Sequence, residues 1–267
     1  MTPLQRERLC VDVCALAREA GDAILEVYDS DFAVQHKDDR SPLTAADIAS
    51  HRVIVAGLNR LTPELPVLSE ESAEIPYLER ARWTHYWLVD PLDGTREFVK
   101  RNGEFTVNIA LIEYGRPLLG VVQAPVTGEI WYAWEGGGAF GQATPAAPPR
   151  RLQTRPRAVP LLVPGSRSHG SEREAELLSR VGAFERLPLG SSLKFCRIAE
   201  GAADLYLRLG PTSEWDTAAA QCVLEQAGGG VVGLDGLPLR CNAHETLLNG
   251  DFIAYGDPAT DWARLFA

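Results

Sequence analysis

The chain has 267 residues, with 26 basic and 36 acidic side chains and a formal net charge of −10. Hydrophobic residues make up 45% of it, which excludes a disordered chain and allows one large domain or two smaller ones. The acidity argues against binding to nucleic-acid polymers or anionic membranes, since both require a basic surface.

The first residues contain no apolar segment typical of a signal peptide, and no apolar run approaches the ~18–20 residues of a transmembrane segment. The five cysteines form no Cys-x-x-Cys pair, which favours buried thiols in a reducing compartment over disulfides or a zinc site. We therefore expect a cytoplasmic protein. Peripheral attachment to the inner face of the cell membrane and homodimer formation are left open.

In the first half of the chain, apolar residues recur at helical spacing over residues 4–28, which predicts an amphipathic helix. A second helix is expected from about Thr44 to Leu61, where Thr62 and Pro63 end it. Short apolar runs then predict strands at 67–68, 86–89, 105–112, 118–123 and 130–134. We expect the 86–89 strand to end at Asp90-Pro91, and the two helices to pack on an antiparallel sheet.

Glycine and proline cluster over residues 136–160, which predicts a boundary between two halves. Residues 1–155 would form an N-terminal α+β half, and residues 156–267 a C-terminal α/β half, because strand and helix signals alternate there. The expected strands are 161–163, 204–207, 231–232 and 252–255, and the expected helices are 171–181, 192–200 and 216–227.

The clearest chemical signal is the run Asp90-Pro91-Leu92-Asp93-Gly94-Thr95. Its two carboxylates follow an apolar strand, and they repel each other unless a cation lies between them. Hard oxygen ligands of this type suit Mg²⁺. An ordinary Asp-Gly turn with an Asp cap is the alternative interpretation.

Three further acidic positions stand at the ends of predicted elements. Glu70 and Glu71 follow a strand, Asp216 opens a helix, and Asp47 lies near the start of another helix. Each has an ordinary alternative: a solvated loop for Glu70, an N-cap for Asp216, and a capping box with Thr44 for Asp47. Together these positions place several carboxylates where open α/β sites lie.

Residues 190–194 combine small side chains, a predicted helix start and Lys194, which is a pattern that can bind phosphate. Ser191, His169 and Arg208 are further candidate contacts for an anion. A surface loop is the alternative for His169, and a solvated strand end is the alternative for Arg208.

Other reaction classes match the chain less well. Haloacid-dehalogenase-type phosphatases carry Asp-x-Asp-Gly-Thr, whereas two residues separate Asp90 from Asp93, so we exclude an aspartyl-phosphate intermediate. Ser191 and Lys194 match the Ser-x-x-Lys of serine acylases, but the chain contains neither Ser-Asp-Asn nor Lys-Thr-Gly. A non-catalytic phosphate- or inositide-binding module would need the anion contacts but not the whole acidic set.

These segments together resemble the lithium-sensitive, Mg²⁺-dependent inositol monophosphatase/fructose-bisphosphatase superfamily, and within it the CysQ-type 3′(2′),5′-bisphosphate nucleotidases. The resemblance covers nearly the whole chain, although Arg96 stands where lysine is common in the CysQ type. Its strongest stretches are residues 41–47, 67–71, 87–98, 101–108, 166–169, 190–196 and 215–219. It implies a layered αβαβα sandwich of mixed α+β and α/β character, with the active site between the two halves.

The resemblance also implies roles for the candidate residues. Two Mg²⁺ ions, with a third left open, would be held by Glu70, Asp90, the Leu92 carbonyl, Asp93 and Asp216. Asp47 and Thr95 would orient and deprotonate the attacking water, with Glu70 as a further catalytic residue. The substrate would contact Leu92, Asp93, Gly94, Thr95, His169, Ser191, Lys194, Arg208 and Asp216.

The activity that the resemblance implies is hydrolysis of the 3′-phosphate of adenosine 3′,5′-bisphosphate to AMP and phosphate, without a covalent intermediate. This small nucleotide is a by-product of sulfate activation, and its sulfated form would be a further substrate. An inositol-1-phosphatase or a fructose-1,6-bisphosphatase that uses the same metal site stays open as the alternative.

Overall fold

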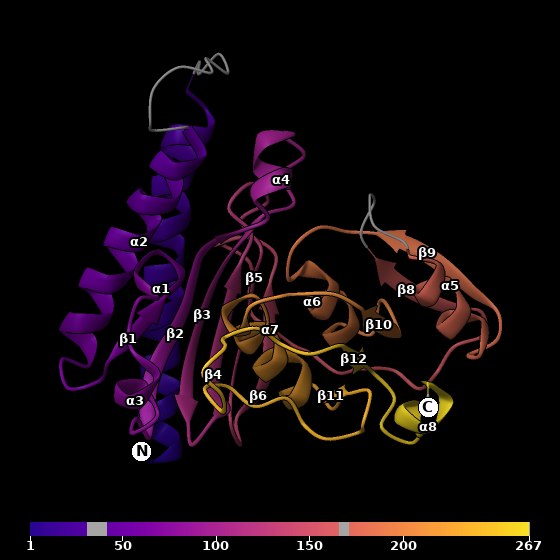
Figure 1. Ribbon diagram of the computed structural model, residues 1–267. Coiled ribbons are helices and arrows are strands. Elements are labelled where there is room, and N and C mark those ends of the chain that lie inside the picture. The colour runs from indigo at the N-terminus through magenta and orange to yellow at the C-terminus, as the bar shows by residue number, and fades with distance from the viewer. Residues whose placement is uncertain (31–41, 166–170, 267) are drawn as a thin grey trace.

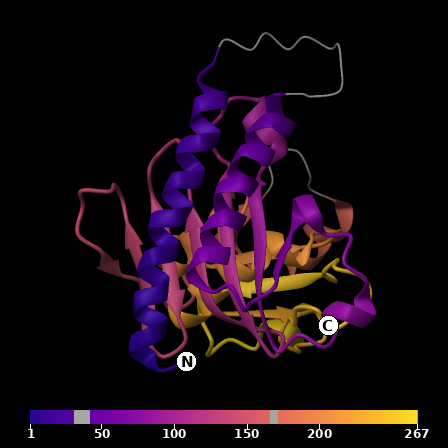
Figure 2. The same cartoon turned by 90° about the vertical axis from the view of Figure 1, so that its left-hand side faces the viewer.

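The computed structural model describes residues 1–30, 42–165 and 171–266. Two long helices pack side by side on one face of the larger sheet, as Figures 1 and 2 show. Helix α1 (Pro3–Tyr28) begins with a capping box between Thr2 and Gln5, and its apolar stripe faces the sheet. Helix α2 (Pro42–Leu61) lies beside it. Both predicted helices are therefore confirmed.

Helix α2 begins earlier than predicted. It starts at Pro42 rather than at Thr44, because proline is well suited to the first turn of a helix. Thr44 and Asp47 both lie within the helix, so the alternative of a capping box between them is wrong. Asp47 is therefore available for another role.

Seven strands form the larger sheet, in the order β1-β2-β3-β4-β5-β6-β7. Strand β1 (Val67–Ser69) pairs parallel with β2 (His85–Asp93), and the other neighbouring strands are antiparallel. The remaining strands are β3 (Thr106–Glu113), β4 (Arg116–Gln123), β5 (Ile130–Trp134), β6 (Gly138–Gln142) and β7 (Arg150–Arg151). All strands predicted for the first half are present.

Strand β2 continues further than predicted. Its pairing with β3 includes Asp90, breaks at an irregularity, and resumes at Asp93 opposite Thr106. The expected end at Asp90-Pro91 is wrong because a bulge lets an antiparallel strand accommodate a proline and resume pairing. Both aspartates are consequently held by the sheet.

Residues 136–160 also depart from the prediction. They contain β6 and β7, which extend the larger sheet as far as Arg151. Gly138 packs closely against β7, since a Cβ at this position would lie 2.8 Å from the Arg151 guanidinium. The division of the chain at residue 155 stays a prediction.

Three short elements, η1 (Glu70–Ser72), α3 (Tyr77–Arg80) and α4 (Thr95–Val99), are too brief to show a hydrophobic period.

The second half builds a smaller antiparallel sheet in the order β10-β12-β11, beside a parallel pair of β8 and β9. These strands are β8 (Leu161–Gly165), β9 (Phe184–Pro188), β10 (Leu205–Arg208), β11 (Gly230–Gly233) and β12 (Phe252–Tyr255). The helices are α5 (Glu172–Ser179), α6 (Leu193–Ala199), α7 (Glu214–Gln226) and α8 (Trp262–Phe266). Every element predicted here is present. Strand β9 was missed because its side chains are mostly exposed.

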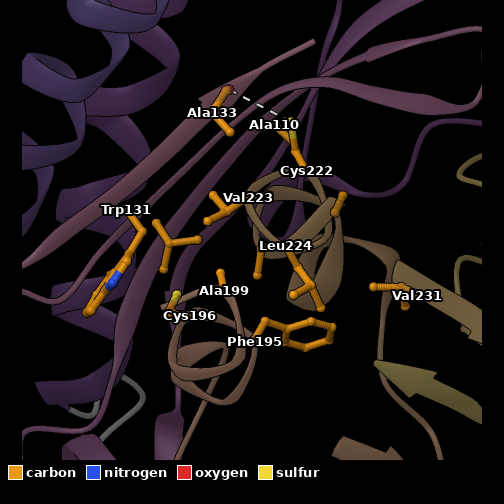
Figure 3. Close-up of a cluster of buried hydrophobic side chains, with 14 of the residues drawn as sticks. Ala110, Trp131, Ala133, Phe195, Cys196, Ala199, Cys222, Val223, Leu224 and Val231 are labelled. Atoms are coloured by element: carbon orange, nitrogen blue, oxygen red, sulfur yellow. Dashed lines mark hydrogen bonds between the residues drawn. The ribbon is translucent and has the colours of Figure 1, made fainter. Parts of the chain in front are cut away.

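Helices α6 and α7 lie between the two sheets, and α5 and α8 cover the far side of the smaller one (Figure 1). The order of layers is therefore the predicted αβαβα. Figure 3 shows how the middle layer is filled: Phe195, Cys196 and Ala199 of α6 and Cys222, Val223 and Leu224 of α7 pack with Trp131, Ala110 and Val231 from the sheets. Among the described helices, none combines the length and the apolar character needed to cross a membrane.

Helix α7 rests directly on the backbone of β4. A Cβ added to Gly120 would collide with the Ala219 carbonyl oxygen and lie 2.7 Å from the Cys222 Cβ. No larger residue fits there unless α7 moves away from the sheet.

We expect Gly120→Ala to lower the free energy of unfolding by about 1–3 kcal/mol, the usual effect of overpacking a buried site. The matched control is Gly250→Ala, because a Cβ added to Gly250 meets nothing within 4 Å. Denaturant unfolding of both variants measures the difference. Equal effects of the two substitutions would contradict direct contact between α7 and β4.

Candidate active site

Parallel pairing of β1 and β2 brings the first two acidic segments together. Ser69 of β1 is paired with Val89 of β2. Glu70, directly after β1, and Asp90 of β2 are therefore neighbours across the two strands. The Glu70 carboxyl group is close enough to Asp90 to raise the pKa of that aspartate. Adjacent parallel strands that end together are the usual place for a site in an open sheet.

Helices from both faces of the sheet add one carboxylate each. Asp47 comes from α2, and burial together with repulsion from Glu71 and Glu70 raises its pKa to about 8. Asp216 comes from α7, and burial raises its pKa to about 6 although the Ser213 N–H stabilises the ionised form. Glu70 repels both groups, so the two helices and the sheet edge share one electrostatic neighbourhood.

The aspartates of β2 lie at the centre of this neighbourhood. Asp90 is 1% exposed, and burial followed by repulsion from Asp93, Glu70, Asp216 and Asp47 raises its pKa far above the usual value. Burial and Asp216 raise the pKa of Asp93 to about 7, while Lys194 and the Ser192 N–H oppose the shift. Charges that repel one another in a poorly solvated region call for a counter-charge.

The donor set fits a hard divalent cation such as Mg²⁺, because it consists of carboxylates with backbone carbonyls close by. One buried oxygen, Asp47 Oδ1, has no hydrogen-bond partner among the described residues. In residues 1–30, 42–165 and 171–266, however, no three His, Cys, Asp or Glu side chains are already arranged around one point as metal ligands. Backbone N–H groups hold one oxygen each of Asp90, Asp93 and Asp216.

A cavity of about 500 Å³ opens beside this acidic cluster. Its lining includes six of the predicted site residues: Asp93, Gly94, Ser191, Lys194, Arg208 and Asp216. It therefore combines the edge of the acidic cluster with three cationic side chains, Arg96, Lys194 and Arg208. The six predicted residues come from β2, the start of α4, the start of α6, β10 and α7, which are far apart along the chain.

Lys194 and Arg208, two of the three cations that line the cavity, are held in different ways. Lys194 is 6% exposed, its Nζ donates to the Ser191 carbonyl at 2.6 Å, and it lies over the Tyr206 ring. Burial lowers the Lys194 pKa to about 8. Arg208 donates from Nη2 to the Pro211 carbonyl, while its buried Nε has no partner among the described residues.

The other predicted residues are placed less tightly. Leu92 is buried in β2, and Thr95 is the exposed first residue of α4. Helices α2 and α4 contact each other, yet no hydrogen bond joins Asp47 to Thr95 within the described residues. His169 lies outside the described residues, together with residues 166–168.

Two placements differ from the sequence interpretation. Asp216 is not an N-cap: Ser213 is, and Asp216 is the third helical residue, whose Oδ2 accepts from the Ser213 N–H at 2.9 Å. Glu71, to which we assigned no role, lies close enough to Asp47 to raise the pKa of that aspartate. Its adjacency to Glu70 was the available signal, but sequence alone does not show which of two neighbouring glutamates faces inward.

Known proteins resemble this chain along almost its full length. A family model described as the inositol monophosphatase family matches residues 5–262. The 3′(2′),5′-bisphosphate nucleotidase CysQ of Salmonella typhimurium is 51% identical over 243 residues, which cover 90% of this chain and 96% of that protein.

Solved structures give the same result for the fold. CysQ from Bacteroides thetaiotaomicron, a bacterial member of the inositol monophosphatase family, has a TM-score of 0.85 at 37% identity, covering 93% of this chain and 97% of that one. An inositol monophosphatase from Zymomonas mobilis shares the fold, with a TM-score of 0.79 at 23% identity over 97% of this chain and 98% of its own.

The acidic cluster makes stability depend on pH when divalent cations are chelated. The pKa values of Asp216, Asp93 and Asp47 are about 6, 7 and 8 in the folded chain, against an ordinary aspartate pKa of 3.8. At pH values between the ordinary pKa of these groups and their raised values, the folded state binds more protons than the unfolded state. The free energy of unfolding therefore falls as pH rises. We expect the unfolding midpoint in EDTA to decrease from pH 5.5 to pH 8, and Asp90→Asn to flatten this decrease.

The control for this measurement is Glu176→Gln, which removes an exposed carboxylate of α5 whose side chain is 68% accessible. This variant should keep the slope of the unmodified protein. A midpoint in EDTA that stays constant or rises over the same range would contradict mutual repulsion in the cluster.

Proposed function

The chain belongs to the inositol monophosphatase family, and we propose that it is a Mg²⁺-dependent 3′(2′),5′-bisphosphate nucleotidase. It hydrolyses the 3′-phosphate of adenosine 3′,5′-bisphosphate to AMP and inorganic phosphate. The observation that carries this proposal is a single cavity whose lining combines the carboxylates of Asp93 and Asp216 with the cations Lys194 and Arg208.

A bisphosphate matches this distribution of charge. One phosphate lies beside Asp93 and Asp216, where a divalent cation offsets the negative charge of the carboxylates. The second phosphate contacts Lys194 and Arg208. The buried Nε of Arg208, which has no hydrogen-bond partner among the described residues, supports this assignment, because a buried donor without a partner is unfavourable until an acceptor arrives. A monophosphate would leave Lys194 and Arg208 without a phosphate to bind.

Glu70, Asp90, the Leu92 carbonyl, Asp93 and Asp216 would hold Mg²⁺, as two ions in our proposal. Bound there, the metal supplies Lewis-acid stabilisation of the phosphoryl oxygens and lowers the pKa of the attacking water. All five positions lie on β2, directly after β1, or in the first turn of α7. Rigid elements therefore present the ligands.

The chain's own groups handle the proton and the phosphate. Asp47, a buried carboxyl group of α2 beside the proposed metal ligands, accepts the proton of the attacking water; burial raises its pKa to about 8 before any cation is bound. The Thr95 hydroxyl, at the start of α4, accepts a hydrogen bond from the attacking water and donates one to Asp47. The backbone N–H groups of Gly94 and Thr95 bind the phosphate. The P–O3′ bond breaks, and its oxygen leaves as the 3′-hydroxyl of AMP after taking up a proton.

The proposal extends to the cellular role and location. Removal of adenosine 3′,5′-bisphosphate clears a by-product of sulfate activation, and the sulfated nucleotide is a second substrate of the same cavity. A cytoplasmic location is supported by the five free thiols, of which Cys10, Cys196, Cys222 and Cys241 are buried.

Phosphate release should be compared on adenosine 3′,5′-bisphosphate, inositol 1-phosphate and fructose 1,6-bisphosphate under one set of conditions. We expect the nucleotide to be the best substrate by kcat/KM, EDTA to abolish turnover, and Li⁺ to inhibit it. Asp93→Asn should lose at least a hundredfold in kcat, about 2.7 kcal/mol of transition-state stabilisation. A preference for either sugar phosphate would replace the proposal with that activity.

Lys194→Met tests the contact with the second phosphate separately from the reaction at the metal site. Loss of a hydrogen bond to a charged group, about 1.5–3 kcal/mol, should raise KM for adenosine 3′,5′-bisphosphate about tenfold to a hundredfold. KM for 3′-AMP, which lacks the second phosphate, should change less than threefold. Lys100→Met, at an exposed lysine outside the cavity, is the control. Equal effects of Lys194→Met on both substrates would refute the second-phosphate contact.

A further inference from the structure

The loop before α6 is docked tightly onto the larger sheet. The Gly190 N–H donates to Glu104 Oε2 at 2.9 Å, and the Ser192 N–H donates to Asp93 Oδ2 at 2.7 Å. A Cβ on Gly190 would lie 2.6 Å from the Glu97 Cγ, so the loop backbone itself touches the sheet connection. Asp93 is thus held by a residue from the other half of the chain.

Ser192 occupies the N-cap position of α6 but does not cap the helix with its side chain. A serine at this position usually accepts a hydrogen bond from a helical N–H, which contributes about 1 kcal/mol. Here the hydroxyl turns to the sheet instead. Its Oγ lies 2.8 Å from Asn108 Oδ1 and 2.8 Å from Thr106 Oγ1.

The direction of the protons in this network follows from the groups involved. Asn108 Oδ1 can only accept, so the Ser192 hydroxyl donates to it. The Thr106 hydroxyl contacts Ser192 Oγ at 2.8 Å and also donates to Ser191 Oγ at 3.2 Å. The side chains of Thr106, Asn108 and Ser192 are buried, with at most 1% exposure. Hydrogen bonds of this kind, shielded from water, determine a single arrangement of the loop.

Strand register places the network beside the acidic motif. Asn108 is paired with Asp90 across β2 and β3, and Thr106 is paired with Asp93. Residues directly opposite in an antiparallel pair project to the same face of the sheet. Asn108 Nδ2 is buried without a partner among the described residues, an arrangement that lowers stability. The network is therefore not the one that stability alone would favour.

We propose that Thr106, Asn108 and Ser192 are positioning residues for the hydrolytic reaction. Their hydroxyl and amide contacts fix the Ser192 backbone, so that its N–H holds Asp93 Oδ2 and leaves Oδ1 directed to the cation. This inference rests on the proposed function, in which Asp93 is a metal ligand. The three residues touch neither substrate nor metal and act through Asp93.

Two variants test the network, and the first readout needs no catalysis. Ser192→Ala and Thr106→Val each remove one hydroxyl, and Thr106→Val keeps the shape of the side chain in case Ser192→Ala does not fold. Unfolding midpoints measured across a Mg²⁺ titration, without substrate, give the half-saturating Mg²⁺ concentration. We expect it to rise about tenfold or more, since residues that orient metal ligands change metal affinity by about 10–100-fold.

The matched control is Thr62→Val. The Thr62 hydroxyl accepts from Trp87 Nε1 at 2.8 Å and is also buried, but it lies against the start of β2, remote from Asp93. This variant should lose stability and keep the Mg²⁺ dependence of the unmodified protein. Thr106→Ser, which retains the hydroxyl, should restore that dependence. On adenosine 3′,5′-bisphosphate, the two network variants should lower kcat and leave KM within about twofold.

A Mg²⁺ dependence unchanged in both Ser192→Ala and Thr106→Val would overturn the positioning role, and so would an equal shift in Thr62→Val. The proposed function is judged on the unmodified protein alone. If that protein is stabilised by Mg²⁺ but does not hydrolyse the bisphosphate, the function is wrong, while the shift between variants still decides the network.

Discussion

Repulsion among carboxylates at the end of β2 is the constraint on which the rest of the structure depends. Asp90 and Asp93 are placed in the sheet beside Glu70, and α2 and α7 add Asp47 and Asp216 from its two faces. Buried charges of one sign raise each other's pKa, and their stability in the ionised form requires a cation. The fold supports this arrangement with apolar layers on either side of the sheet, which hold the helices in place against the repulsion.

The same constraint explains why an acidic chain can bind an anion. The carboxylates recruit a divalent cation, and the cation then attracts phosphate, so the net charge of −10 is no obstacle to a small substrate. Lys194 and Arg208 line the same cavity as Asp93 and Asp216. A cavity that holds both a cation-binding carboxylate set and basic side chains suits a ligand that carries two phosphates.

Besides the apolar middle layer, identifiable polar contacts join the two halves of the chain at the site. The Ser192 N–H from the second half reaches Asp93 in the first, and Asp216 approaches from α7, which itself rests on the glycine backbone of β4. A displacement of α6 or α7 would therefore change the carboxylate geometry directly. Packing of the middle layer and chemistry at the sheet edge are coupled through these contacts.

The sequence by itself determined the longer helices, most of the strands and the acidic motifs, because hydrophobic period, turn residues and runs such as Asp90 to Thr95 are local properties. The short helices α3, α4 and α8 were not predicted. Only the tertiary structure decided that β2 continues through Pro91, that Asp216 follows a Ser213 cap, and that Gly138 belongs to a strand rather than a linker. It also decided that Ser192 faces Asn108 and not its own helix. These features depend on strand register and on contacts between residues distant in the chain, which no local pattern contains.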